Sequence, residues 1–143
     1  MSLIRPFPGL RPPVDLAPKV ASPPYDVLNS AEARVMAEGN PVSFLHVIKP
    51  EIDLPADIDP YDDRVYAQAV AGLKSLEDQG ALVQDDQPYL YLYKQRMGDH
   101  EQFGLMTCVS ADEYERDLIK KHEFTRPDKE NDRTRHVSDT DVN

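Results

Sequence analysis

Residues 59–80, DPYDDRVYAQAVAGLKSLEDQG, carry the clearest secondary-structure signal in the chain. Asp59 can act as an N-cap, Pro60 suits the first helical position, and Asp62 suits the first turn. Apolar side chains then recur every three or four residues, and Gly80 provides a stop. The sequence predicts a core helix over 60–79. The buried face of this helix is expected to comprise Tyr61, Val65, Ala69, Leu73 and Leu76.

Around this helix, four segments are predicted as strands of one small mixed sheet, at about 44–48, 81–84, 89–96 and 102–109. Tyrosine and leucine alternate over 89–93, which is typical of a strand, and Gly98-Asp99 suits a turn. Apolar residues on both faces of 103–109 predict a strand that is covered on both sides. Cys108 would then be an inert buried thiol. The predicted fold class is α+β, with the sheet packed by two or three helices.

The first 28 residues hold seven of the 13 prolines, which fits neither a helix nor a central strand. They are predicted to form an extended strap. A short helix at about 30–38 is expected between the Asn29–Glu32 box and Gly39, and another from about Ala111 to Lys120. In the turn 21–27 at the end of the strap, Tyr25 and Asp26 either line a pocket or serve packing and capping.

Length and composition limit the function. The 143 residues suit one domain, divided into the strap 1–28, an α+β core 29–118 and a charged segment 119–143. A net charge of −10 disfavours a general nucleic-acid-binding surface. The single cysteine excludes an intramolecular disulfide, and the sequence shows neither a signal peptide nor a membrane span. We therefore expect a cytoplasmic protein, with the oligomeric state left open.

The charged segment contains the densest cluster of functional side chains. Residues 119–136, IKKHEFTRPDKENDRTRH, hold six of the 16 lysines and arginines and two of the four histidines. A helix over 127–137 would place Lys129, Arg133 and His136 on one stripe. Such a cluster suits phosphate, which binds to arginine forks, lysines and helix-start amides. The other expected phosphate or ligand contacts are Tyr25, Lys120, Lys121, Thr125 and Arg126.

Two interpretations of this cluster remain open. In the first, Glu123 or Asp26 acts as a general base towards a hydroxyl, and His122 assists it. No metal site built by the protein is expected in this interpretation. In the second, the segment is a solvated helix stabilised by ion pairs four residues apart. A zinc site is not supported, because Arg126 stands where the second histidine of a zincin motif would be.

Four motifs resemble one known family. They are residues 5–12 (RPFPGLRP), 21–27 (ASPPYDV), 40–51 (NPVSFLHVIKPE) and 119–130 (IKKHEFTRPDKE). Together they resemble the domain-of-unknown-function 1015 (DUF1015) family, whose members are bacterial and archaeal proteins often described as similar to ParB. The charged cluster coincides with one of the family motifs, so the resemblance favours a site over a solvated face.

The resemblance also implies that residues 1–143 form the N-terminal part of a longer protein. Family members typically carry an Asp-Gly-His-His-Arg motif further downstream. That motif also marks free-serine kinases of the ParB/sulfiredoxin-like superfamily, where it serves nucleotide phosphates. The first expectation is therefore part of a nucleotide- or phosphate-dependent enzyme, such as a small-molecule kinase that binds a nucleotide or a phosphorylated compound. The cofactor that this expectation suggests is ADP or ATP with Mg²⁺. The alternative is a non-catalytic, ParB-like regulatory or nucleic-acid-associated module.

Overall fold

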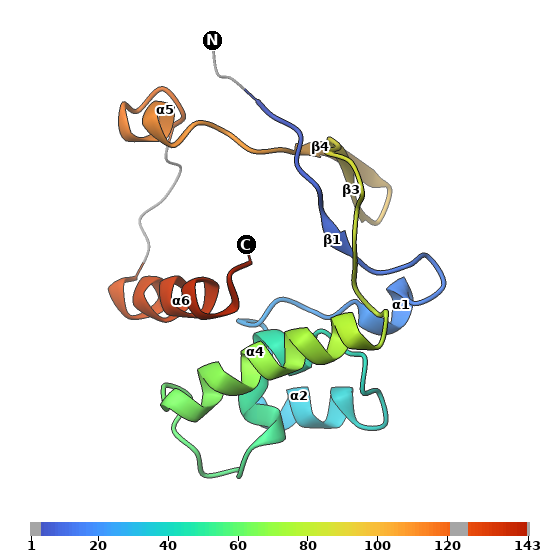
Figure 1. Cartoon of the computed structure of the whole chain (residues 1–143), viewed down its shortest axis with the longest axis vertical. Coiled ribbons are helices and arrows are strands. Elements are labelled where there is room, and N and C mark those ends of the chain that lie inside the picture. The colour runs from blue at the N-terminus through green and yellow to red at the C-terminus, as the bar shows by residue number, and fades with distance from the viewer. Residues whose placement is uncertain (1–3, 121–125, 143) are drawn as a thin grey trace. The chain divides into compact units, whose positions relative to one another are not determined.

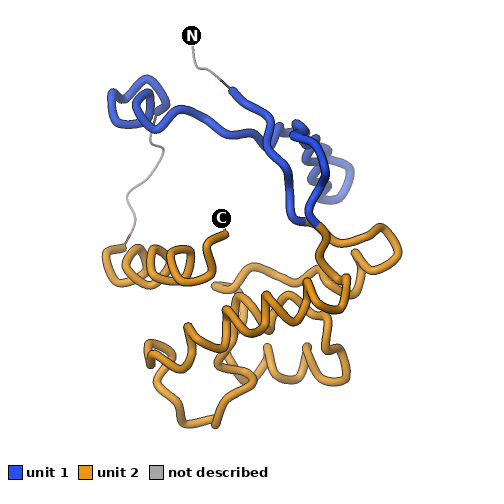
Figure 2. Tube along the Cα trace, viewed as in Figure 1, with its two compact units in different colours: residues 1–10, 84–124 blue, residues 11–83, 125–143 orange. Residues whose placement is uncertain are grey.

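The computed structural model describes residues 4–120 and 126–142, which fall into two compact units (Figures 1 and 2). Unit 1 comprises residues 1–10 and 84–124, and unit 2 comprises residues 11–83 and 125–143. The short strands β1 (Leu10–Arg11) and β2 (Val83–Gln84) pair with each other. Helices together with two antiparallel two-stranded sheets confirm the α+β class. The prediction of a single mixed sheet is wrong, because the strands form two separate pairs.

Unit 2 is built from helical segments around one long helix (Figure 1). The predicted helix is present as α4 (Asp63–Asp78), but Asp62 rather than Asp59 caps it, accepting the Arg64 amide. Tyr61 therefore lies before the helix and is exposed, whereas Tyr66 is buried. The partners of α4 within unit 2 are α3, the 3₁₀ helix η1 and α6. The helical segments are α1 (Ala17–Val20), α2 (Ser30–Ala37), α3 (Leu45–Ile48), η1 (Pro50–Asp53), α4 and α6 (Pro127–Thr140).

The segment 44–48 is a helical turn and not the predicted strand. Successive amides bond back along it, including Ile48 N–H to the Phe44 carbonyl oxygen at 3.1 Å. A short apolar run fits a buried strand or a buried helix equally well, so periodicity cannot distinguish the two. Packing decides the matter here, because α3 lies directly against α4. A Cβ added at Gly72 would lie 2.6 Å from the His46 carbonyl oxygen.

The expected helix at 30–38 is confirmed as α2, and it anchors a local core. Asn29 and Glu32 form the reciprocal capping box. Ala33 and Ala37 pack with Leu45 and Ile52. The Arg34 guanidinium donates to the carbonyl oxygens of residues 51, 52 and 54, which fixes η1 beside α2. The proline-rich strap is interrupted by α1, which was not expected, with Pro18 in its first turn.

Unit 1 contains the predicted hairpin, formed by β3 (Tyr91–Met97) and β4 (His100–Met106). Its antiparallel register runs from Tyr91–Met106 to Met97–His100, and Gly98 in the turn has φ +61°. The expectation that the second strand is covered on both sides is wrong. Leu105 and Met106, on opposite faces, are 50% and 53% exposed.

Two further expectations in unit 1 are corrected. Cys108 is exposed rather than buried, and its backbone pairs with that of Arg5 beyond the end of β4. Helix α5 (Ala111–Glu115) begins where predicted, with Ser110 as its N-cap, but ends five residues before Lys120. The chain leaves the helix through Asp117, whose φ is +57°.

Candidate functional site

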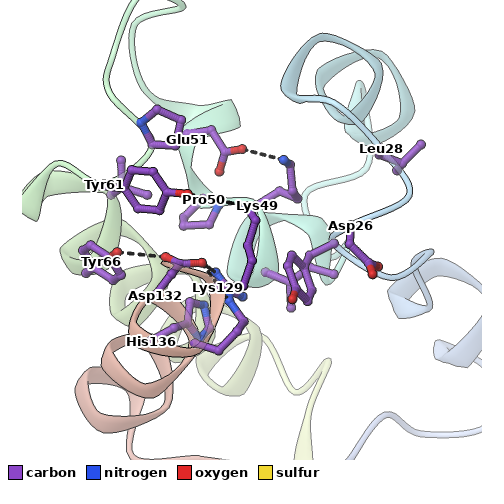
Figure 3. A pocket seen from close by; sticks show the side chains of 15 residues that line it. Asp26, Leu28, Lys49, Pro50, Glu51, Tyr61, Tyr66, Lys129, Asp132 and His136 are labelled. Carbon is purple, nitrogen blue, oxygen red and sulfur yellow. Dashed lines mark hydrogen bonds and ion pairs between the residues drawn. The ribbon is translucent and has the colours of Figure 1, made fainter. Parts of the chain in front are cut away.

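A pocket of about 250 Å³ lies in unit 2 (Figure 3). Its walls come from α6, from the start of α4, from residues 25–28 and from the junction of α3 with η1. In Figure 3, Asp26 and Leu28 lie on one side and Glu51, Tyr61 and Tyr66 on the other, with Lys49 and Lys129 between them. The pocket thus joins segments that are far apart in the sequence.

Helix α6 is held in place as one wall by contacts with α4 and α3. The Tyr66 hydroxyl donates to Asp132 Oδ1 at 2.8 Å, and the Arg135 guanidinium lies 3.9 Å from the centre of the Tyr66 ring. His136 is buried, and its Nε2 donates to the Val47 carbonyl oxygen at 2.8 Å. These contacts fix which side chains of α6 face the pocket.

Two cations of α6 line the pocket. Arg133 Nη2 lies 2.7 Å from Asp132 Oδ2, and the guanidinium carbon lies 4.3 Å from the centre of the Tyr25 ring. Lys129 Nζ is 3.5 Å from the Tyr61 hydroxyl, at the outer limit for a hydrogen bond. Lys129 is therefore only weakly engaged and is available to an anionic ligand.

A third cation belongs to a buried polar group on the opposite wall. Lys49 Nζ lies 2.9 Å from Glu51 Oε1, and the Ser30 hydroxyl donates to the same oxygen at 2.8 Å. Only 15% of the Lys49 side chain and 8% of the Glu51 side chain are exposed. Burial alone would raise the pKa of Glu51, but the hydrogen bonds from Lys49 and Ser30 outweigh it and lower this pKa. Glu51 is therefore ionised at neutral pH and keeps Lys49 in place.

Asp26 completes the charged lining. It lies at the exposed rim, and within the described residues its carboxylate has neither a hydrogen-bond partner nor an ion-pair partner. The pocket thus carries three cationic and three anionic side chains: Lys49, Lys129 and Arg133, and Asp26, Glu51 and Asp132.

Apolar side chains also contribute to the lining. They include Leu28, Ile48 and Val65. Such side chains exclude water and strengthen the electrostatic interactions beside them. The same effect is visible at Tyr66, which is 4% exposed. Burial, with the hydrogen bond to the charged Asp132, raises the pKa of Tyr66 to about 12. Tyr66 is therefore a neutral donor that fixes Asp132.

The structure brings five of the sequence-predicted site residues to this pocket: Tyr25, Asp26, Lys129, Arg133 and His136. The last of these has a structural contact through Nε2. Arg126 is not among the lining residues and pairs with Asp128 at 2.8 Å, with 76% of its side chain exposed. Lys120, in unit 1, pairs with Asp117. Four predicted residues lie outside the described part of the chain: Lys121, His122, Glu123 and Thr125.

The sequence analysis did not identify the cation Lys49 or the polar residues that form hydrogen bonds and ion pairs in the pocket. Lys49 and Glu51 follow the apolar run 44–48 directly, within the motif 40–51. A charged pair that ends an apolar segment was a signal that could have been used. Asp132 and Tyr66 could not be found in the same way, because their pairing spans 66 residues.

Neither a metal centre nor a membrane span is found among the described residues. Within residues 4–120 and 126–142, no three His, Cys, Asp or Glu side chains form a group that could hold a metal ion. In the same residues, no helix combines the length and the apolar character needed to cross a bilayer.

The family model named "Protein of unknown function (DUF1015)" matches residues 4–143. The chain belongs to this family. The match covers every described residue of the DUF1015 chain, including all segments that line the pocket. No match was found among curated proteins or solved structures.

Proposed function

We propose that this DUF1015 chain binds the phosphate group of a nucleotide or of a phosphorylated small molecule, as part of an enzyme of phosphoryl transfer. One observation carries the proposal. Lys129 and Arg133, on one face of α6, line the same pocket as Lys49 and the carboxylate of Asp26, which has no partner within the described residues. Lysine and arginine are the usual phosphate ligands, and stabilising the phosphoryl charge is the main task in such reactions.

In the proposed reaction, the Asp26 carboxylate accepts the proton of an acceptor hydroxyl. The hydroxyl oxygen forms a bond to phosphorus of a nucleoside diphosphate or triphosphate. The bond from that phosphorus to the bridging oxygen breaks, and the leaving oxygen keeps the electron pair. Lys129 and Arg133 neutralise the charge on the transferred group. Magnesium would enter with the nucleotide, since it is commonly bound by phosphates and one or two carboxylates.

Three finer points belong to the same proposal. Glu123 with His122 remains the alternative base, outside the described residues. The reaction would take place in the cytoplasm, where nucleotides are abundant. The kinase chemistry would follow that of the ParB/sulfiredoxin-like superfamily suggested by the sequence resemblance. The non-catalytic, nucleic-acid-associated alternative is disfavoured by the net charge of −10.

Thermal unfolding with inorganic phosphate, ADP and ATP tests the proposal. A ligand at 100 times its Kd adds about 2.7 kcal/mol to the stability of the folded state. We expect at least one of the three compounds to raise the Tm. Lys129→Gln and Arg133→Gln are expected to weaken this binding at least about tenfold, the loss of one charge-assisted hydrogen bond.

Two controls are matched to these variants. Lys74→Gln removes an exposed lysine of α4 that pairs with Asp78, and Arg126→Gln removes the exposed arginine next to α6. Both variants should bind the ligand with the affinity of the wild type. An unchanged Tm with all three compounds contradicts the proposal. Salt-sensitive DNA binding by the same protein would favour the nucleic-acid-associated module instead.

A further inference from the structure

We infer that the compound held by the pocket is a small phosphate monoester that also carries a hydroxyl or ammonium group, and that Asp26 recognises this group. The inference rests on the proposed function and specifies its substrate class. It follows from which charges of the pocket already have partners, and from the size of the pocket.

Two of the three carboxylates already have partners within the protein. Glu51 accepts from Lys49 and Ser30, and Asp132 accepts from Arg133 and Tyr66. Each of these carboxylates therefore has a cation and a hydroxyl of its own. Neither needs a group from a ligand.

One cation and one carboxylate of the pocket lie outside these two ion pairs. Within the described residues, Lys129 Nζ contacts only Tyr61, at 3.5 Å from the hydroxyl and 6.0 Å from the centre of the ring, and Asp26 has no partner. Asp26 is not required as a helix cap, because Asn29 caps α2. A ligand that satisfies both must bring an anionic group to Lys129 and a hydrogen-bond donor to Asp26.

A bare polyanion matches this arrangement poorly. Its negative charges would lie in one pocket with the carboxylates of Asp26, Glu51 and Asp132. Like charges at short range repel, most strongly where apolar walls exclude water. A donor on the ligand turns the interaction with Asp26 from repulsive to attractive, and thereby makes Asp26 a specificity determinant.

The size of the pocket limits the ligand as well. Pockets for drug-sized ligands enclose about 300–1,000 Å³. This pocket has about 250 Å³, so it fits a compound smaller than a nucleotide. In the proposed reaction the pocket accordingly holds the small ester, with its phosphate as the group that Lys129 and Arg133 neutralise, while the nucleoside lies outside the pocket.

Isothermal titration calorimetry with four probes tests the inference: sn-glycerol 3-phosphate, propyl phosphate, AMP and inorganic phosphate. Glycerol phosphate and propyl phosphate share the charge and the chain length and differ in two hydroxyls. We expect glycerol phosphate to bind at least about tenfold more tightly than propyl phosphate, the effect of one hydrogen bond to a charged group. AMP should bind more weakly than glycerol phosphate.

The variant Asp26→Asn tests the assigned residue. It should reduce the preference for glycerol phosphate to less than about threefold while leaving propyl phosphate bound at least as tightly, because a negative charge is removed. Asp15→Asn, which makes the same change at an exposed position of unit 2 outside the pocket lining, should keep the full preference.

The outcomes separate the two proposals. Equal binding of the two esters, or a preference that survives Asp26→Asn, overturns the inference while the phosphate site stands. Absence of binding by all four probes, or binding that is unaffected by Lys129→Gln, overturns the proposed function itself and the inference with it.

Discussion

The ion pairs of the pocket and those around α5 have nearly the same lengths but different surroundings. Arg133–Asp132 and Lys49–Glu51 in unit 2 measure 2.7 and 2.9 Å, and Arg116–Asp112 and Lys120–Asp117 in unit 1 both measure 3.0 Å. The carboxylates of the pocket pairs are 10% and 8% exposed, whereas those near α5 are 72% and 64% exposed.

The ion pairs also differ in the additional hydrogen bonds that their carboxylates accept. Asp132 accepts the hydroxyl of Tyr66, and Glu51 that of Ser30, from residues distant in the sequence. The pairs near α5 join residues three or four apart. A high density of charge therefore does not identify a site. Burial and long-range hydrogen bonds distinguish the charges that the fold positions from those that solvent surrounds.

The largest effect is expected for Lys49→Met. It leaves Glu51 buried without its cation, and removing one partner of a buried pair typically costs roughly 3 kcal/mol. Lys120→Met makes the same change in an exposed pair and should leave the stability unchanged. Urea unfolding at pH 7 measures both, and equal effects would remove the distinction between the two regions.

The Lys49–Glu51 pair should make the free energy of unfolding depend on pH in the acidic range. The pKa of Glu51 in the folded protein lies below its ordinary value of 4.5. Its ionised form therefore contributes stability above about pH 4.5, and this contribution is lost as the pH falls through the folded-state pKa. Since Lys49→Met removes a main cause of the low pKa, the difference between wild type and variant should narrow below pH 4.5. A constant difference from pH 7 to pH 3 would contradict the assigned role of Glu51.

A smaller effect is expected for Tyr66→Phe. The variant loses one hydrogen bond to a charged group, worth about 1–2 kcal/mol, while Asp132 keeps Arg133. The pKa of Tyr66 is raised to about 12, so its contribution is complete below pH 10 and is lost as the pH rises through 12. Absorbance at 295 nm should show a wild-type step near pH 12 that is absent from the variant. Tyr93→Phe, at an exposed tyrosine of the hairpin, should retain the step.

The smallest effect is expected for Arg116→Ala in α5. Its partner Asp112 is four residues away, and both side chains are mostly exposed. Isolated pairs of this kind often contribute nothing measurable, so the Tm should stay within about 1 °C of wild type. A larger decrease in calorimetry would show that the α5 region is as strongly organised as the pocket.

Local signals were sufficient to predict much of the fold. The helix α4, the capped helix α2 and the β3–β4 hairpin follow from apolar periodicity, the Asn29–Glu32 box and the Gly98 turn. The strand prediction for the segment 44–48 failed because its four apolar residues suit either a strand or a helical turn. The pairing of strands into two separate sheets is a long-range property that no local pattern contains.

The candidate site was predictable only where local spacing determines the position of a side chain. Helical spacing places Lys129 and Arg133 on one stripe, and the structure brings both to one pocket. The spacing does not show that Arg126, only three residues earlier, points to its neighbour Asp128 instead. Nor does it reveal Lys49, which reaches the pocket from the other wall through the packing of α3 and η1.

The most direct test of the phosphate site is an amide NMR titration of the full chain with propyl phosphate, a probe that is independent of the role assigned to Asp26. We expect chemical-shift changes in residues 25–28, 49–51 and 129–136, with none at 112–117. Changes centred on α5, or none in the three pocket segments, would contradict the assignment of the phosphate site to this pocket.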